Sequence, residues 1–205
     1  MDNVYKLSHD NDHSGDSEID AKVIEFEGSS KLPYYLIDVK TYSLNVLPSR
    51  IYCQANLSLI PDYDYPLTDM EIPIMSLKML EILESVNPFD YYRIPVIMLD
   101  DTCLDLIPEG IDRILQIDSY FTIRLNEIND GFFDYEKSDF KMSRRLEGQI
   151  GRIKQIVLKR PDHGFPPLFR ISETPSTLFI SFEAKEALEA ANIKGCVFEE
   201  VEVSE

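Results

Sequence analysis

The chain has 205 residues, of which 44% are hydrophobic and 28% are charged, as in an ordinary globular protein. With 37 acidic and 20 basic side chains its formal net charge is −17, which excludes direct binding to the phosphate backbone of nucleic acids. The three cysteines lie far apart without a CxxC pair, so they predict neither a disulfide framework nor a zinc site. No apolar run approaches the length of about 18 residues that a membrane span needs, and no apolar N-terminal segment is present. We therefore expect a cytoplasmic protein.

The first part of the chain is rich in strand patterns. Alternating or β-branched and aromatic residues predict strands within 3–8, 22–27, 32–40 and 49–60. The polar stretch 9–20 predicts a loop, and so does 61–73, which carries three prolines and four acids. We expect residues 1–70 to form an N-terminal, strand-rich segment of the same globule as an α+β region over 71–205.

Two stretches of the chain are nearly alike. PIMSLKMLEILESVN (73–87) and LFISFEAKEALEAAN (178–192) share five residues when aligned on Ser76 and Ser181. Each serine can accept a hydrogen bond from the first turn of a helix, which predicts capped helices directly after both. Strands are predicted after both helices, at 91–99 and 196–203, and before the second helix at 177–180, so each copy is a strand–helix–strand or a helix–strand unit. Two interpretations remain open, namely an internal duplication of a strand–helix–strand unit and convergence on a favourable helix pattern.

The remaining segments are also mostly strand-like. A short helix followed by a strand at 119–126 is predicted after residue 106, and further strands at 150–160 and 167–172. The fold class that follows is α+β, mostly antiparallel strands with two or three short amphipathic helices. Residues 141–160 hold seven bases and one acid. They predict either a patch for an acidic ligand or an exposed strand whose charges discourage edge pairing.

A search for catalytic and metal-binding patterns finds little. None of the common nucleotide, hydrolase or metalloprotease motifs is present. His9 and His13 lie among aspartates that could hold a metal ion, but such segments are usually just solvated. His163, beside Asp162 in a Gly/Pro loop, could act as a base if a cysteine lay near it. We predict no enzyme, no cofactor and no metal.

Three loops are rich in carboxylates, and two of them, 61–69 and 129–140, also carry aromatic rings. Aromatic side chains anchor interfaces, and carboxylates accelerate encounter with a basic partner. For any single loop, the rings can equally serve to pin a polar segment to the core. The candidate partner-binding residues are Asp62, Tyr63, Asp64, Tyr65, Asp100, Asp101, Asp130, Phe132, Asp134 and Tyr135. On composition alone, reversing the charges of Asp62 and Asp64 together should slow association and leave folding intact.

The C-terminal stretch LFISFEAKEALEAANIKGCVFEEVEV carries a recognisable pattern. A strand leads into a Ser-started helix, a turn with Lys194 and Gly195, and a Phe-containing acidic strand. In this it resembles the C-terminal signature of immunity-protein family 11 of bacterial polymorphic toxin systems, formerly a domain of unknown function. The similarity extends upstream through PIMSLKMLEIL and SYFTIRLNEIND, so that it covers about residues 70–203. One departure is NIKG, where a Gly-Leu pair is expected before the Lys-Gly.

The resemblance implies a protein that binds a cognate toxin and blocks it, and it transfers no catalytic residue. A toxin that is itself basic would fit the acidic composition of this chain. Two alternatives from other classes stay open. One is an enzyme with an unrecognised site around His163, and the other is a self-assembling scaffold that forms a homo-oligomer.

Overall fold

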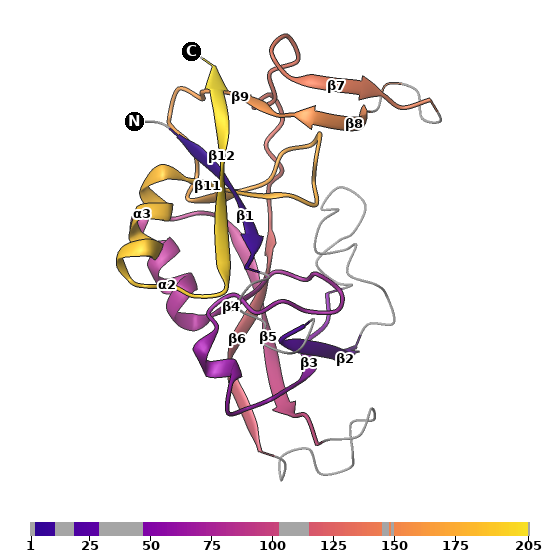
Figure 1. Ribbon diagram of the computed structural model, residues 1–205, viewed down its shortest axis with the longest axis vertical. Coiled ribbons are helices and arrows are strands. Elements are labelled where there is room, and N and C mark those ends of the chain that lie inside the picture. Colours follow the sequence, from indigo (N-terminus) through magenta and orange to yellow (C-terminus); the bar gives the residue numbers. More distant parts are fainter. Residues whose placement is uncertain are drawn as a thin grey trace.

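A computed structural model describes residues 3–10, 19–28, 47–102, 115–144, 148 and 150–204 (Figure 1). Within them, the elements run in the following order: β1 Val4–His9, β2 Ala21–Glu27, β3 Arg50–Ala55, the 3-10 helix η2 Ile60–Asp62, β4 Ile74–Ser76, α2 Leu77–Val86, β5 Tyr91–Asp100, β6 Gln116–Leu125, β7 Asp139–Met142, β8 Ile150–Gln155, β9 Val157–Lys159, β10 Leu168–Phe169, β11 Leu178–Ser181, α3 Phe182–Ala190 and β12 Cys196–Ser204.

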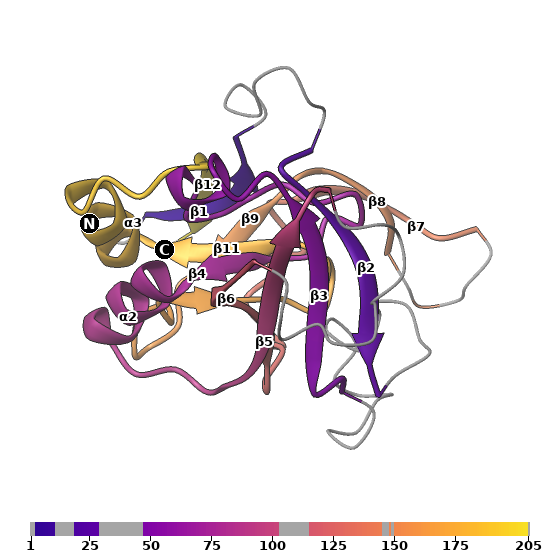
Figure 2. The same cartoon turned by 90° about the horizontal axis from the view of Figure 1, so that it is seen from below.

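The described residues are mainly β, so the predicted α+β class is wrong. The part of the chain that the structure describes contains twelve strands in three sheets and two α-helices, of ten and nine residues. The helices form no layer of their own, because they lie together at one side of the molecule while the strands β2, β3 and β5 extend on the other (Figure 2). The strand predicted at 32–40 lies outside the described residues, as does most of the segment after residue 106 for which a short helix is predicted. None of the described helices is long and apolar enough to cross a membrane.

Two five-stranded sheets share one arrangement. One sheet has the order β4–β6–β5–β3–β2 and the other β10–β11–β1–β12–β9. In the first, β6 lies antiparallel between β4 and β5, and β3 runs parallel to β5. In the second, β1 lies antiparallel between β11 and β12, and β9 runs parallel to β12. We call β3, β4, α2, β5 and β6 the first unit, and β9, β11, α3, β12 and β1 the second unit.

The two units also agree in strand register. Ser76 and Val96 lie opposite Tyr120 in the first unit, and Ser181 and Val201 lie opposite Val4 in the second. The serines are 105 positions apart in sequence, as are the valines. The pairs Tyr52↔Ile97 and Val157↔Glu202 repeat the same offset in the parallel strands. Convergence on a favourable helix pattern would not fix the register of distant strands, so this agreement favours duplication over convergence.

The second unit differs in the origin of its middle strand. In the first unit the middle strand β6 follows β5 in the chain, whereas in the second it is β1, from the other end of the sequence. The amide of Asn3 donates to Glu200 at 2.8 Å, which ties the start of β1 to β12. The second unit is therefore a permuted version of the first, completed by the N-terminal strand (Figure 1).

Both predicted helix caps are present. The Oγ of Ser76 accepts from the backbone N–H of Met79 at 3.1 Å, and that of Ser181 accepts from Ala184 at 3.3 Å. Each cap satisfies one of the free donors that every helix N-terminus leaves. After α3 the backbone turns through Asn192, whose φ of 53° is left-handed.

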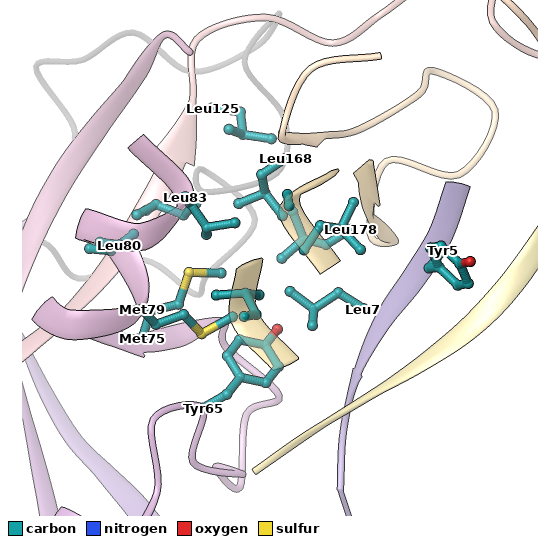
Figure 3. Close-up of a cluster of buried hydrophobic side chains, with 14 residues drawn as sticks. Tyr5, Leu7, Tyr65, Met75, Met79, Leu80, Leu83, Leu125, Leu168 and Leu178 are labelled. Atoms are coloured by element: carbon teal, nitrogen blue, oxygen red, sulfur yellow. The ribbon is translucent and has the colours of Figure 1, made fainter. Parts of the chain in front are cut away.

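The largest described hydrophobic cluster joins the two units. Met75, Met79 and Leu83 of the first unit and their counterparts 105 positions later, Ile180, Ala184 and Leu188, are all fully buried in it. Figure 3 shows side chains from α2, β1, β11 and the loop before β4 converging on this core. Burying a large apolar side chain contributes about 1.5–3 kcal/mol, so the shared core holds the units to each other.

The basic segment 141–160 forms no single long strand. It contains the end of β7 and then β8 and β9, which are separated at Ile156. Strands β7 and β8 pair only with each other among the described strands, and this ribbon stands out from the two large sheets (Figure 1). Arg152 and Lys154 are exposed on it, and Lys154 pairs with Asp139 at 3.0 Å.

Candidate partner-binding site

The predicted loop at 62–65 is partly a structural link between the units. Asp64 accepts from the Oγ of Ser76 at 2.6 Å with one carboxylate oxygen and from the backbone N–H of Lys194 at 3.1 Å with the other. Its side chain is only 15% exposed. Asp62, in contrast, is exposed at the end of η2. Of these two carboxylates, Asp62 is the one fully available to a partner.

The two tyrosines of the same loop also differ. Tyr63 is half-buried, and its backbone carbonyl accepts from the hydroxyl of Tyr120 at 2.9 Å. Tyr65 is 3% exposed, and its ring stacks on that of His9 with centroids 4.3 Å apart. Burial raises the pKa of the Tyr65 hydroxyl and lowers the pKa of His9 to about 4. Tyr65 therefore belongs to the core.

The acids at the end of β5 form a small turn. One carboxylate oxygen of Asp100 accepts from both the backbone N–H and the hydroxyl of Thr102. These two hydrogen bonds hold the pKa of Asp100 below its usual value, because they favour the charged form. Asp101 is exposed.

In the third loop, Asp134 serves the fold. It is 5% exposed and accepts from the hydroxyl of Ser204 at 2.7 Å and from the backbone N–H groups of Glu136 and Lys137. The hydrogen bond from Ser204 is the main cause that lowers the pKa of Asp134. The carboxylate thereby ties the turn after Phe133 to the end of β12.

The other three candidates in this loop are more accessible. Asp130 is exposed and accepts from the hydroxyl of Ser172. Phe132 is half-buried, with its ring edge-on to Phe169 at a centroid distance of 5.6 Å. Tyr135 is 52% exposed and donates to Glu173 at 2.6 Å, which raises its pKa to about 12.

The structure does not gather the three loops into one surface. Residues 100–101 lie at the C-terminal end of β5 at one end of the molecule, whereas 133–135 lie against β9 and lead to β7 near the other end (Figure 1). The predicted candidates that remain exposed are Asp62, Asp101, Asp130 and Tyr135.

The groups that an enzyme around His163 would need are not assembled in the described residues. Cys53 is buried in β3 and Cys196 lies in β12, and neither lines the hollows beside His163. Burial raises the pKa of both thiols, that of Cys196 to about 12. Cys103 lies outside the described residues. In the part of the chain that the structure describes, no group of three or more His, Cys, Asp or Glu side chains could hold a metal ion; His13 is not in that part.

A hollow that the sequence did not predict lies between the two units. One cavity of about 310 Å³ is bounded by residues 87–90 after α2, by the end of β6 and by the loop 163–169. A second, of about 240 Å³, shares His163 and Phe165 with the first and reaches Ser181 and Glu183 at the start of α3. We call the two together the inter-unit cleft. Five separate stretches of the chain build it, so no local sequence pattern marks it.

The cleft is acidic and aromatic. Its walls include Phe89 and Phe165, and its carboxylates are Asp90, Glu127 and Glu183. No lysine or arginine is among the described residues that line it. A further hollow of about 370 Å³ beside the β7–β8 ribbon differs in charge, because Lys6, Arg152 and Lys154 line it.

The family model for Immunity protein 43 matches residues 2–203. This chain belongs to the Immunity protein 43 family. The resemblance to an immunity-protein family is thereby confirmed, under the number 43 where the sequence pattern suggested family 11. No curated protein matches the chain.

The match to the Immunity protein 43 model includes the N-terminal strand β1. The match begins at residue 2, so it spans β1 as well as the two repeated stretches and the cleft between them. Membership in an immunity-protein family implies that the partner of this chain is a toxin.

Proposed function

We propose that this chain binds a cognate bacterial toxin and blocks the toxin's activity by protein–protein contact. The observation that carries the proposal is the match to the Immunity protein 43 model along almost the whole chain. The chain would act without catalysis, in the cytoplasm of the cell that produces the toxin.

The charge of the chain supports a basic toxin as the partner. A net charge of −17 creates a negative field that speeds encounter with a basic surface, by a factor of about 10–1000 in steered complexes. Many toxins that act on nucleic acids or phosphate-bearing substrates need a basic active site. An acidic surface seated over such a site would exclude the substrate by both bulk and charge.

The exposed candidates give this proposal specific contact residues. Asp62, Asp101, Asp130 and Tyr135 are exposed. Asp130 and Tyr135 also make hydrogen bonds within the chain, with Ser172 and Glu173, so changes at Asp62 and Asp101 should affect folding least. Because the four residues lie at separate places, one toxin domain of ordinary interface size would contact some of them and leave the others free. Single charge reversals at the three aspartates would therefore show which end of the molecule faces the toxin.

Co-expression with the protein encoded directly beside this chain tests the function. The neighbour alone should stop growth, and this chain should restore growth and co-purify with the neighbour. A matched control carries a stop codon early in this chain, so that the message is made without the protein. If the neighbour is harmless, or if growth returns without a complex, direct neutralisation by this chain is refuted.

A further inference from the structure

We propose that the inter-unit cleft is a docking pocket for an arginine side chain on the partner toxin. This inference rests on the proposed function, which it makes specific by naming a site and the chemistry of its occupant. Its support comes from the shape, the charge and the aromatic walls of the cleft.

The cleft has the size of a side-chain pocket. Its two hollows, which share lining residues, measure about 310 and 240 Å³, at or below the lower end of the range for sites that enclose whole ligands, about 300–1000 Å³. The floor consists of the buried residues Leu125, Leu168 and Phe169. A pocket with an apolar floor and polar rim suits the anchor residues that dominate protein interfaces, among which arginine is prominent.

The charges of the cleft select a cation. Glu127 and Glu183 are exposed and have no hydrogen-bonded or ion-paired partner among the described residues. One carboxylate oxygen of Asp90 accepts from the side chain of Asn126 at 2.8 Å, which fixes its orientation. Carboxylates left without a cation of their own, with no lysine or arginine beside them, are complementary to a basic group from outside.

The aromatic walls favour arginine over lysine. Phe89 stacks on Tyr91 with centroids 4.7 Å apart, and Phe165 stacks on Phe169 at 5.4 Å and an angle of 15°, so both rings are held in place. A guanidinium can lie flat on such a ring and still donate two parallel hydrogen bonds to a carboxylate, which an ammonium cannot. The chain makes a cation–π contact of its own, where the Cζ of Arg93 lies 4.6 Å from the ring centroid of Phe121.

The first experiment uses this chain alone and a short probe. A capped Gly-Arg-Gly peptide is titrated into the ¹⁵N-labelled protein, with capped Gly-Lys-Gly as the comparison. We expect saturable shifts confined to residues 87–90, 127 and 163–165, with the lysine peptide weaker. The Glu127→Lys/Glu183→Lys double variant should weaken binding of the arginine peptide by about tenfold or more, because two attractive charges become repulsive.

A matched variant controls for net charge. Glu25→Lys/Glu81→Lys changes the total charge equally, and both glutamates are exposed and are not among the residues that line the cleft. This control should bind the arginine peptide as the unchanged protein does. Melting temperatures of both variants, followed by circular dichroism, show that each is folded. Shifts outside the cleft, or equal weakening in both variants, would overturn the proposal whatever the toxin does.

The second experiment uses the toxin and separates this inference from the function. If the unchanged chain neutralises the toxin and Glu127→Lys/Glu183→Lys slows association by about tenfold while the control does not, the cleft is the docking pocket. If both variants bind the toxin as tightly as the unchanged chain, the proposed function stands and the cleft proposal falls. If the cleft binds Arg152 of a second copy instead, the protein will sediment as a dimer that the double variant dissolves, which also overturns it.

Discussion

Replacing Asp64 with alanine should destabilise the fold much more than replacing its neighbour Asp62. Asp64 accepts two hydrogen bonds, from Ser76 Oγ at 2.6 Å and from the backbone N–H of Lys194 at 3.1 Å, and thereby joins the first unit to the turn that leads into β12. Hydrogen bonds to a charged group contribute about 1.5–3 kcal/mol each, and neighbouring bonds are rarely additive. Its ion pair with Lys78 adds little, because Lys78 is 54% exposed.

We therefore expect Asp64→Ala to lower the free energy of unfolding by about 2–4 kcal/mol and the melting temperature by about 5–15 °C. Asp62→Ala should stay within about 0.5 kcal/mol of the unchanged protein, since Asp62 is exposed. Urea denaturation followed by circular dichroism measures both values. Equal stabilities for the two variants would refute the role of Asp64 as a link. The double charge reversal suggested by composition is for the same reason unsuitable as a pure binding test.

Three further predictions concern other sites. Gly195→Ala should lower the melting temperature more than Gly164→Ala, by the equivalent of about 1–3 kcal/mol. Both glycines have positive φ. A Cβ at 195 would lie 2.7 Å from the backbone carbonyl oxygen of Tyr65, whereas the space at 164 is open. In an ultraviolet pH titration, with Tyr135→Phe to assign the signal, Tyr135 should ionise near pH 12 and Glu173→Gln should move it towards 10. Because the folded pKa is raised, the stability that this hydrogen bond adds is complete below pH 10 and is lost as the pH rises to about 12. Cys53, fully buried with a raised pKa, should resist a thiol reagent such as Ellman's at pH 8 in the native protein and react once urea unfolds it; rapid native labelling would contradict its burial.

The local parts of the fold were predictable from sequence, and the pairing between distant parts was not. The caps at Ser76 and Ser181, the strands after both helices and the strand before the second helix follow from short-range rules and are confirmed. The class was wrong because it depends on how strands assemble. Nothing local to Val4 indicates that it lies between Ser181 and Val201, and this placement builds the second large sheet.

The binding site illustrates the same limit. Acidic and aromatic residues in a loop sequence do not reveal which carboxylates form hydrogen bonds within the protein. Asp64 and Asp134 both accept hydrogen bonds from donors more than ten residues away. The inter-unit cleft has the converse property. Phe89, Glu127 and Phe165 are unremarkable where they stand in the sequence and meet only because the two units pack together.

The position of β1 in the chain delays completion of the second unit during synthesis. β1 is made before the other described strands, yet both of its partners, β11 and β12, are made more than 170 residues later. At a synthesis rate of about 5–20 residues per second, roughly 10–40 s pass before β1 can form backbone hydrogen bonds with these two strands. A chain cut short anywhere before β12 therefore cannot close its second unit, so a cell that depends on this protein against a toxin gains protection only from completed copies.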